Sequence, residues 1–133
     1  MNACGYSLGA TFSPTWIDWP MLFTGNPYVI EPGNNAGEVF DIHAKTFDDL
    51  GYNKSRMNAC GYSLGNTFSP NWMDWPMLYT GNPYLIEPGN IFFMHMILMD
   101  SENQLAMNLG ETYLVTDNGN ERLGKQKLDL VIL

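Results

Sequence analysis

The apolar residues between positions 35 and 51 recur at intervals of three and four, which predicts an amphipathic helix. They are Val39, Phe40, Ala44, Phe47 and Leu50. Asn35 stands three residues before Glu38, the spacing of a capping box, in which each side chain bonds the other residue's backbone N–H. Gly51 is a natural stop, because glycine readily adopts the left-handed conformation that ends many helices. The pattern therefore predicts a helix over residues 35–51.

Residues 91–133 instead carry patterns that are typical of strands. Residues 91–99 (IFFMHMILM) are apolar at nearly every position, which predicts a central strand covered on both faces. Residues 111–116 (ETYLVT) are rich in β-branched and aromatic side chains, and the Asp-Asn-Gly that follows predicts a turn. We expect further short strands at 105–107 and, at a sheet edge, at 127–133. A helix followed by antiparallel strands predicts the α+β class, with the helix packed on the sheet.

Residues 1–34 and 57–90 are two copies of one segment, here called the first copy and the second copy. Aligned without gaps, they differ at five positions. The differing pairs are Ala10/Asn66, Thr15/Asn71, Ile17/Met73, Phe23/Tyr79 and Val29/Leu85. Three of these pairs exchange large apolar or aromatic residues of similar volume, a change that packed cores tolerate well. The second copy is dense in Gly, Pro, Asn and Trp, which favours short strands and structured loops over a helix.

The repetition ends abruptly after Asn34 and Asn90, and a 22-residue spacer separates the copies. Solenoids need about three or more units of shorter period, so a solenoid does not explain the repeat. We interpret it as recombination between two related genes or an artefact of gene assembly, rather than as a purposeful tandem module. We divide the chain into residues 1–34 and 35–133. We expect the first copy to lie loosely docked or swapped onto another chain, since the second copy is joined directly to the strand at Ile91.

The charge and the N-terminal sequence argue against several classes of partner. The net charge is −8, with six Lys and Arg and no basic cluster, so nucleic acid and anionic membranes would be repelled. The first residues lack the charged and apolar regions of a signal peptide, and the stretch 91–99 is too short to span a bilayer. Cys4 and Cys60 occupy one position of the repeat, which copying explains without a disulfide, so we expect a reduced, cytoplasmic protein. No His or Asn lies at a catalytic spacing from Cys60, which we interpret as a small buried residue.

Three motifs follow the predicted helix in a fixed order: CGYSLG, EPGNIFFMHM and LGETYLVTDNG. This order resembles the C-terminal half of the creatinase, prolidase and methionine aminopeptidase family, which has the "pita-bread" fold. The strings WMDWPM and HMILMDS look most like the branch of ectoine hydrolases and Xaa-Pro peptidases of the aminopeptidase P type. The resemblance covers residues 37–133. It implies a partial pita-bread fold, that is, an incomplete half-domain whose missing partner would leave an apolar face of the sheet exposed.

The resemblance also says which residues would stand at the family's metal-binding positions. The family's metallopeptidases hold two metal ions with two aspartates, a histidine and two glutamates. No segment here matches the one that carries the aspartates, Tyr62 (and Tyr6) stands for the histidine, and His95 stands for the first glutamate. Gly110 takes the place of the last glutamate, and Glu111 comes one residue late unless a bulge restores it. We therefore expect no metal ion and no cofactor.

Creatinase, a member of the same family, implies that C–N bonds can be cleaved on this fold without metal. By that resemblance His95 would carry the proton, and Tyr62 would donate a hydrogen bond to the substrate carbonyl or its oxyanion. Glu111 would orient His95 or bind a cationic substrate. The alternatives are a hydrogen-bonded core histidine, a packing tyrosine and a solvent-exposed glutamate.

Trp72, Asp74 and Trp75 form a second candidate site. Their indole rings and carboxylate would suit a small cationic or zwitterionic solute held by cation–π contacts. Packing in the core or at a subunit interface is the alternative for the tryptophans.

The sequence thus supports three hypotheses about function. The first is a truncated hydrolase, related to enzymes that cleave small amides, cyclic amidines such as ectoine, or Xaa-Pro peptides, and inactive alone. The second is a non-catalytic interaction protein or domain-swapped homo-oligomer, and the third is a module that binds small solutes.

Overall fold

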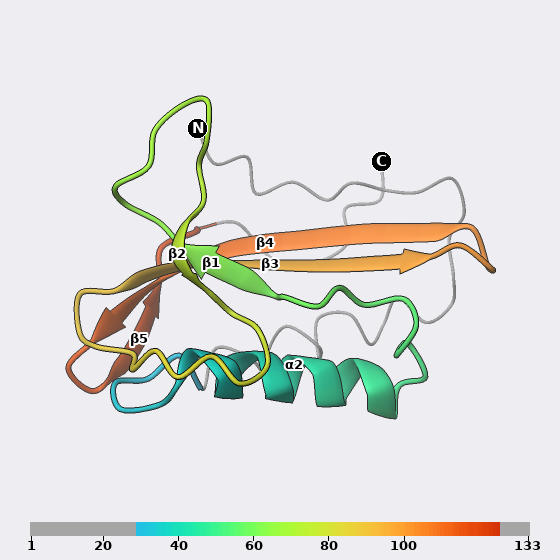
Figure 1. Ribbon diagram of the computed structural model, residues 1–133, viewed down its shortest axis with the longest axis horizontal. Coiled ribbons are helices and arrows are strands. Elements are labelled where there is room, and N and C mark those ends of the chain that lie inside the picture. The colour runs from blue at the N-terminus through green and yellow to red at the C-terminus, as the bar shows by residue number, and fades with distance from the viewer. Residues whose placement is uncertain (1–28, 126–133) are drawn as a thin grey trace.

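The computed structural model describes residues 29–125 and shows one helix packed on a five-stranded antiparallel sheet (Figure 1). The helix is α2 (Ala36–Asp49), and the sheet has the order β2-β1-β3-β4-β5. The strands are β1 (Gly61–Ser63), β2 (Asp74–Met77), β3 (Ile91–Asp100), β4 (Leu105–Thr116) and β5 (Gly119–Arg122). This arrangement confirms the predicted α+β class. Residues 1–28 and the strand expected at 127–133 lie outside the described residues.

Helix α2 begins and ends where the sequence places its signals. The backbone N–H of Asn35 donates to the Glu38 carboxylate over 2.9 Å, as a capping box requires. At the other end, Gly51 has a φ of +85° and its N–H donates to the Asp48 carbonyl. The buried face carries the predicted apolar residues except Leu50, which follows the helix and is 41% exposed. The predicted helix is therefore confirmed to within two residues at its C-terminal end.

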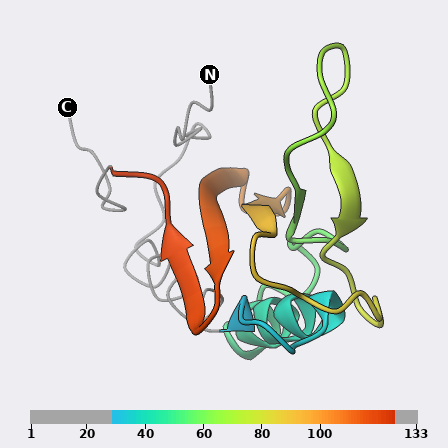
Figure 2. The ribbon, with the colours of Figure 1, turned by 90° about the vertical axis from the view of Figure 1, so that its left-hand side faces the viewer.

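Strand β3 is the centre of the sheet, and its side chains alternate between two environments. Phe92, Met94, Met96 and Leu98 are buried in the core with the apolar face of α2. The residues between them are half-buried and point to the other face, which no helix covers in the described part of the chain (Figure 2). The sequence correctly predicts a central strand, but only one of its faces is packed in a closed core.

Strand β4 is longer than the sequence predicts. Residues 105–107 and 111–116 were expected as separate strands, whereas the structure joins them because β3 offers an uninterrupted ladder of partners from Ile91↔Leu114 to Asp100↔Leu105. The predicted turn after residue 116 is confirmed, since Thr116 pairs with Gly119 and β5 returns along β4. The edge of the described sheet on this side is β5.

The described end of the first copy packs against the end of the second copy. Ile30 is fully buried in the core, as is Ile86. The Gly33 N–H donates to the Ile86 carbonyl over 3.0 Å, and the Ile86 N–H donates to the Asn34 carbonyl over 2.9 Å. Residues 29–34 therefore form part of the fold, directly before α2. No helix among the described residues is long and apolar enough to cross a membrane.

The core between α2 and the sheet predicts a clear contrast between two phenylalanines. Phe47 is fully buried, whereas Phe68 is 81% exposed. We expect Phe47→Ala to lower the free energy of unfolding by about 3–5 kcal/mol, because a large buried side chain leaves a cavity. The matched control Phe68→Ala should change it by less than about 0.5 kcal/mol. Urea unfolding followed by circular dichroism measures both, and equal losses would contradict the packing described.

A second prediction concerns acid stability and His43, which lies on the buried face of α2. Burial, and then the nearby Arg56 charge, lower the pKa of His43 to about 4, against a smaller opposing effect of Asp48. In the unfolded chain His43 therefore binds a proton below pH ~6.5, whereas in the folded chain it binds one only below about pH 4. We expect stability to fall with decreasing pH through this window, by at most about 1.4 kcal/mol per pH unit. His43→Leu should have a flatter profile between pH 6.5 and 4, and parallel profiles for the two proteins would refute the assignment.

Candidate functional site

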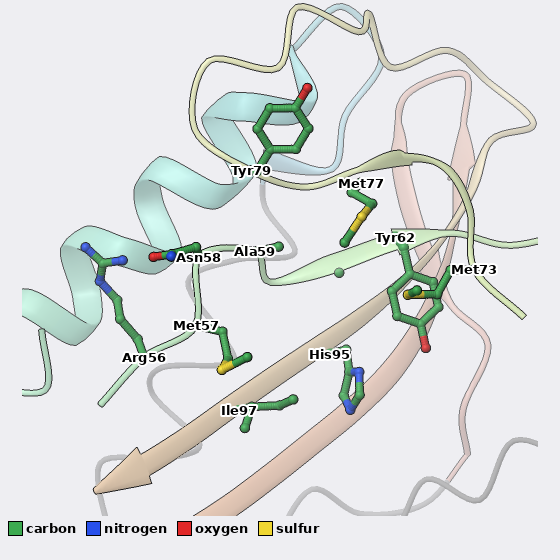
Figure 3. Close-up of a pocket in the computed structure, with 11 residues that line it drawn as sticks. Arg56, Met57, Asn58, Ala59, Tyr62, Met73, Met77, Tyr79, His95 and Ile97 are labelled. Carbon is green, nitrogen blue, oxygen red and sulfur yellow. The ribbon is translucent and has the colours of Figure 1, made fainter. Parts of the chain in front are cut away.

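A groove of about 540 Å³ lies on the side of β3 that faces away from the α2 core (Figure 3). Its lining comes from the segment before β1, from β1, from both ends of β2 and from β3. The lining residues are Arg56, Met57, Asn58, Ala59, Gly61, Tyr62, Met73, Met77, Tyr79, His95 and Ile97. The groove thus contains two of the predicted catalytic residues, Tyr62 and His95, and a largely apolar wall around them.

Tyr62 and His95 belong to one aromatic cluster that crosses the β1–β3 pair. Tyr62 is paired with Phe93 in the ladder, and their ring centroids lie 5.5 Å apart. The His95 ring stands edge-on to the Tyr62 ring with centroids 6.0 Å apart, and it lies 5.3 Å from the Phe93 ring. The structure therefore brings His95 and Tyr62 together on one face, as their predicted roles require.

The surroundings of the two rings fix their protonation states near neutral pH. Burial lowers the pKa of His95 below its usual value, so the imidazole is neutral and can accept a proton. Burial raises the pKa of Tyr62, with a hydrogen bond to the Trp72 side chain acting in the opposite direction. Because an indole can only donate, the Tyr62 oxygen accepts that bond and its own proton stays available. The pair consists of a proton acceptor beside a neutral hydrogen-bond donor.

Glu111, the third predicted catalytic residue, lies on the opposite face of the sheet. The β3–β4 ladder pairs His95 with Gly110 and Met94 with Glu111, and it contains no bulge that would shift the register. Because successive side chains of a strand point to opposite faces, Glu111 points to the side of Met94 and away from the groove. The alternative of a solvent-exposed Glu111 is also wrong, since the residue is fully buried.

The carboxylate of Glu111 is held by contacts with nearby residues of β4, β5 and the segment that follows β5. Its Oε1 accepts a hydrogen bond from the Thr112 N–H over 2.8 Å, and its Oε2 lies 3.7 Å from the Arg122 guanidinium. A side chain at Gly124 would clash with this carboxylate. Together with burial, the charge of Glu111 also raises the pKa of Tyr113. These contacts tie Glu111 to the β4–β5 hairpin and to the segment after it.

The residues predicted to bind solute, Trp72, Asp74 and Trp75, are not among the lining residues of the groove, and their role as a solute site stays a prediction. Asp74 accepts hydrogen bonds from the Asn66 N–H over 2.6 Å and from the Thr67 N–H and hydroxyl, so its carboxylate closes the loop between β1 and β2. Trp72 and Trp75 are 60% and 66% exposed, which rules out packing in the core of this chain. Packing of the tryptophans at a subunit interface stays a prediction.

The side chains of the groove are not suited to hold the two metal ions of the family's metallopeptidases. The three corresponding positions offer the phenol of Tyr62, the imidazole of His95 and no side chain at Gly110. A side chain at Gly110 would clash with the ring of Phe93, which fills that space. Within residues 29–125 no three His, Cys, Asp or Glu side chains are grouped as a metal site. A two-metal centre needs several hard oxygen ligands, and this donor set does not provide them.

Cys60 is fully buried, and burial raises the pKa of its thiol, which confirms its interpretation as a small core residue. Sequence reasoning missed Met73, Met77, Tyr79 and Ile97 as groove residues. The repeat contained a signal for two of them, because Met73 and Tyr79 are among the five positions at which the copies differ.

The fold and part of the sequence are similar to known proteins. No family model matches the chain. Ectoine hydrolase of Halomonas elongata is 27% identical over 97 residues, which are 71% of this chain and 23% of that protein.

Among solved structures, the prolidase from Pyrococcus horikoshii matches with a TM-score of 0.77 at 18% identity, over 87% of this chain and 32% of its own. The dipeptidase PepE from Mycobacterium ulcerans matches with a TM-score of 0.80 at 18% identity, over 94% of this chain and 33% of its own. The methionine aminopeptidase from Rickettsia prowazekii matches with a TM-score of 0.64 at 15% identity, over 77% of this chain and 48% of its own.

The chain thus spans about a quarter of the length of the curated relative and about a third of the prolidase and dipeptidase structures. Its helix and five-stranded antiparallel sheet correspond to one part of a larger fold that those peptidases share. This protein therefore has a partial pita-bread fold, and it is a distant homologue of ectoine hydrolase.

Proposed function

We propose that this chain supplies one wall of a hydrolase site that cleaves C–N bonds in small amides, cyclic amidines or Xaa-Pro peptides, with ectoine as the first substrate to test. The observation that carries the proposal is the juxtaposition of a neutral imidazole and a protonated phenol, His95 and Tyr62, with ring centroids 6.0 Å apart in one groove. The distant relationship to ectoine hydrolase supports the substrate class.

The two groups suit hydrolysis of an amide or amidine without a metal ion. His95 accepts a proton from water as the water oxygen forms a bond to the substrate carbon. For an amide, Tyr62 donates a hydrogen bond to the oxygen that gains negative charge in the tetrahedral intermediate. His95 then returns the proton to the leaving nitrogen as the C–N bond breaks. Each group has the protonation state that its role needs at neutral pH.

The size and lining of the groove support a compact ligand. Its volume of about 540 Å³ falls in the range of small-molecule sites. Met57, Met77 and Ile97 give it an apolar surface. Tyr79 adds an aromatic residue to this lining.

The remaining walls of the site would come from a second half-domain. The groove lies on the face of the sheet that no helix covers within residues 29–125, and the chain corresponds to about a third of the related structures. A site open to water on one side would neither fix the substrate nor exclude solvent from the developing charge. We therefore propose that the chain alone is inactive, and that it works in the cytoplasm, where its buried Cys60 thiol stays reduced.

This proposal predicts that activity needs both a second half-domain and His95. The purified chain should release no product from ectoine, creatine or an Xaa-Pro dipeptide. Fused behind the part of Halomonas elongata ectoine hydrolase that it does not match, it should hydrolyse ectoine. In that fusion, His95→Ala should lower kcat by about 10²–10⁴-fold, and Tyr62→Phe should lower it by about 10²–10³-fold.

Tyr84→Phe is the matched control, because Tyr84 is half-buried and lies outside the groove lining. Product release by the chain alone above its His95→Ala variant would show that one wall is enough. A folded fusion whose activity is insensitive to His95→Ala would end the catalytic assignment.

A second candidate function, an interaction protein that forms homo-oligomers, is favoured by the large apolar residues on the surface. Phe68, Trp72, Trp75 and Leu85 are each more than half exposed. We expect Trp72→Ser combined with Trp75→Ser to shift any oligomer toward the monomer, because exposed aromatic residues are common anchors of interfaces. Light scattering at micromolar concentration measures this shift. A monomeric parent chain under these conditions would argue against this function.

A further inference from the structure

The first copy contains every buried side chain that holds the second copy in the fold. Between residues 57 and 84 the buried residues are Cys60, Gly61, Tyr62, Pro76, Leu78 and Asn82. The first copy has the same residue at each of these positions, namely Cys4, Gly5, Tyr6, Pro20, Leu22 and Asn26. Identity at all buried positions means that residues 1–28 carry a complete set of core contacts for the same place.

Two glycines show how specific that place is. A Cβ at Gly61 would clash with the Phe93 carbonyl oxygen and would lie 3.0 Å from Leu78 Cδ1, so β1 can approach β3 only with glycine there. Gly81 has a φ of +74°, a conformation that other residues rarely adopt. The first copy keeps both, as Gly5 and Gly25.

The polar contacts of the second copy are also reproduced. The Asn82 amide donates to the Met77 carbonyl over 2.6 Å and fixes the turn after β2. The Thr80 hydroxyl donates to the Asp41 carboxylate of α2. The first copy has Asn26 and Thr24 at these positions, so it can satisfy the same partners.

The differences, by contrast, lie at the groove and in the exposed loop. Of the four that fall within residues 1–28, two correspond to the exposed loop residues Asn66 and Asn71. The other two correspond to Met73 and Tyr79, which line the groove (Figure 3). The first copy would leave the core unchanged and would replace Met73 by isoleucine and the hydroxyl-bearing Tyr79 by phenylalanine.

We propose that residues 1–28 can take the place of residues 57–84 against β3 in the same chain, so that the groove has two alternative walls of different polarity. The attachment of the first copy supports exchange within one molecule. Residues 33 and 34 are hydrogen-bonded to Ile86, and Asn35 forms a bridge with Leu85. The last residues of the two copies therefore lie side by side, which gives the first copy a high effective concentration near the second.

The second copy holds the place in the structure because exchange has an entropic cost. Residues 57–84 are anchored at one end by the Arg56↔Leu98 bridge and at the other by the Leu85↔Asn35 bridge. Released from the sheet, they would form a loop closed between these two bridges. The entropic cost of closing a loop grows slowly with loop length. A substitution that damages the core contacts of the second copy therefore costs more free energy than the exchange does.

The repeat supplies its own probes for a test, because each copy has one cysteine at the same position. In the full-length parent chain we expect iodoacetamide to label Cys60, which is fully buried, roughly 100-fold more slowly than Cys4. In Leu78→Asp, which places a charge in the core contact of the second copy, the order should reverse: Cys4 becomes protected and Cys60 reactive. Mass spectrometry of tryptic peptides distinguishes the two sites.

Leu22→Asp, the same change in the first copy, is the matched control and should label like the parent chain. The double variant should leave both cysteines reactive. Two reactive cysteines in Leu78→Asp alone would overturn the proposal, and so would Cys60 that stays protected in that variant. A protected Cys4 found only in a dimer, by light scattering of the same sample, would refute exchange within one chain. None of these outcomes depends on the proposed hydrolase function.

Discussion

The continuous pairing of β3 with β4 is the constraint on which the rest of the structure depends. Ten consecutive pairs, from Ile91↔Leu114 to Asp100↔Leu105, leave no freedom to shift the register by one residue. The ladder therefore decides which side chains face α2 and which face the groove. His95 lies on the groove side and Glu111 on the core side, and no local adjustment within the ladder can exchange them.

That division explains how one sheet can have both a closed core and an open site. On the α2 side, buried apolar side chains of β3 and β4 pack with the helix. On the other side lies the aromatic cluster of a buried Tyr62 and the half-buried Phe93 and His95. Partial burial is also what gives the cluster its chemistry. It lowers the pKa of His95 and raises that of Tyr62, which leaves both groups neutral.

Much of this fold is predictable from sequence, because residues close together in the chain determine where its helix and its turns begin and end. The capping box of Asn35 and Glu38, the glycine stop at Gly51 and the turn after Thr116 all appear where expected. The groove is different, because its walls come from segments far apart in the chain. Met57, Met73 and Ile97 meet only when β1 and β2 are placed beside β3. Nothing in their own sequence neighbourhood marks them as neighbours of His95.

The site of Glu111 shows why a motif alignment needs the register to be interpreted. By sequence, the carboxylate is displaced by one residue from the family's ligand position, and a bulge would have restored it. The structure keeps the regular ladder, and Phe93 covers the vacant position at Gly110. Phe93 and Gly110 are therefore coupled: a side chain can stand at position 110 only if position 93 carries a smaller residue.

The two IEPGN strings separate what local sequence decides from what tertiary contacts decide. Both form the same turn, with Gly33 and Gly89 at φ of +95° and +89° and an Asn N–H donating to the Glu carbonyl three residues earlier. Local sequence is enough for this, since a Pro-Gly pair specifies the turn. The segments that precede the turns share almost the same sequence, yet β3 offers only one edge for a β1–β2 hairpin. We expect chain connectivity, rather than composition, to decide which copy occupies that edge. The side chains that differ between the copies at the groove then determine what the wall presents to a ligand.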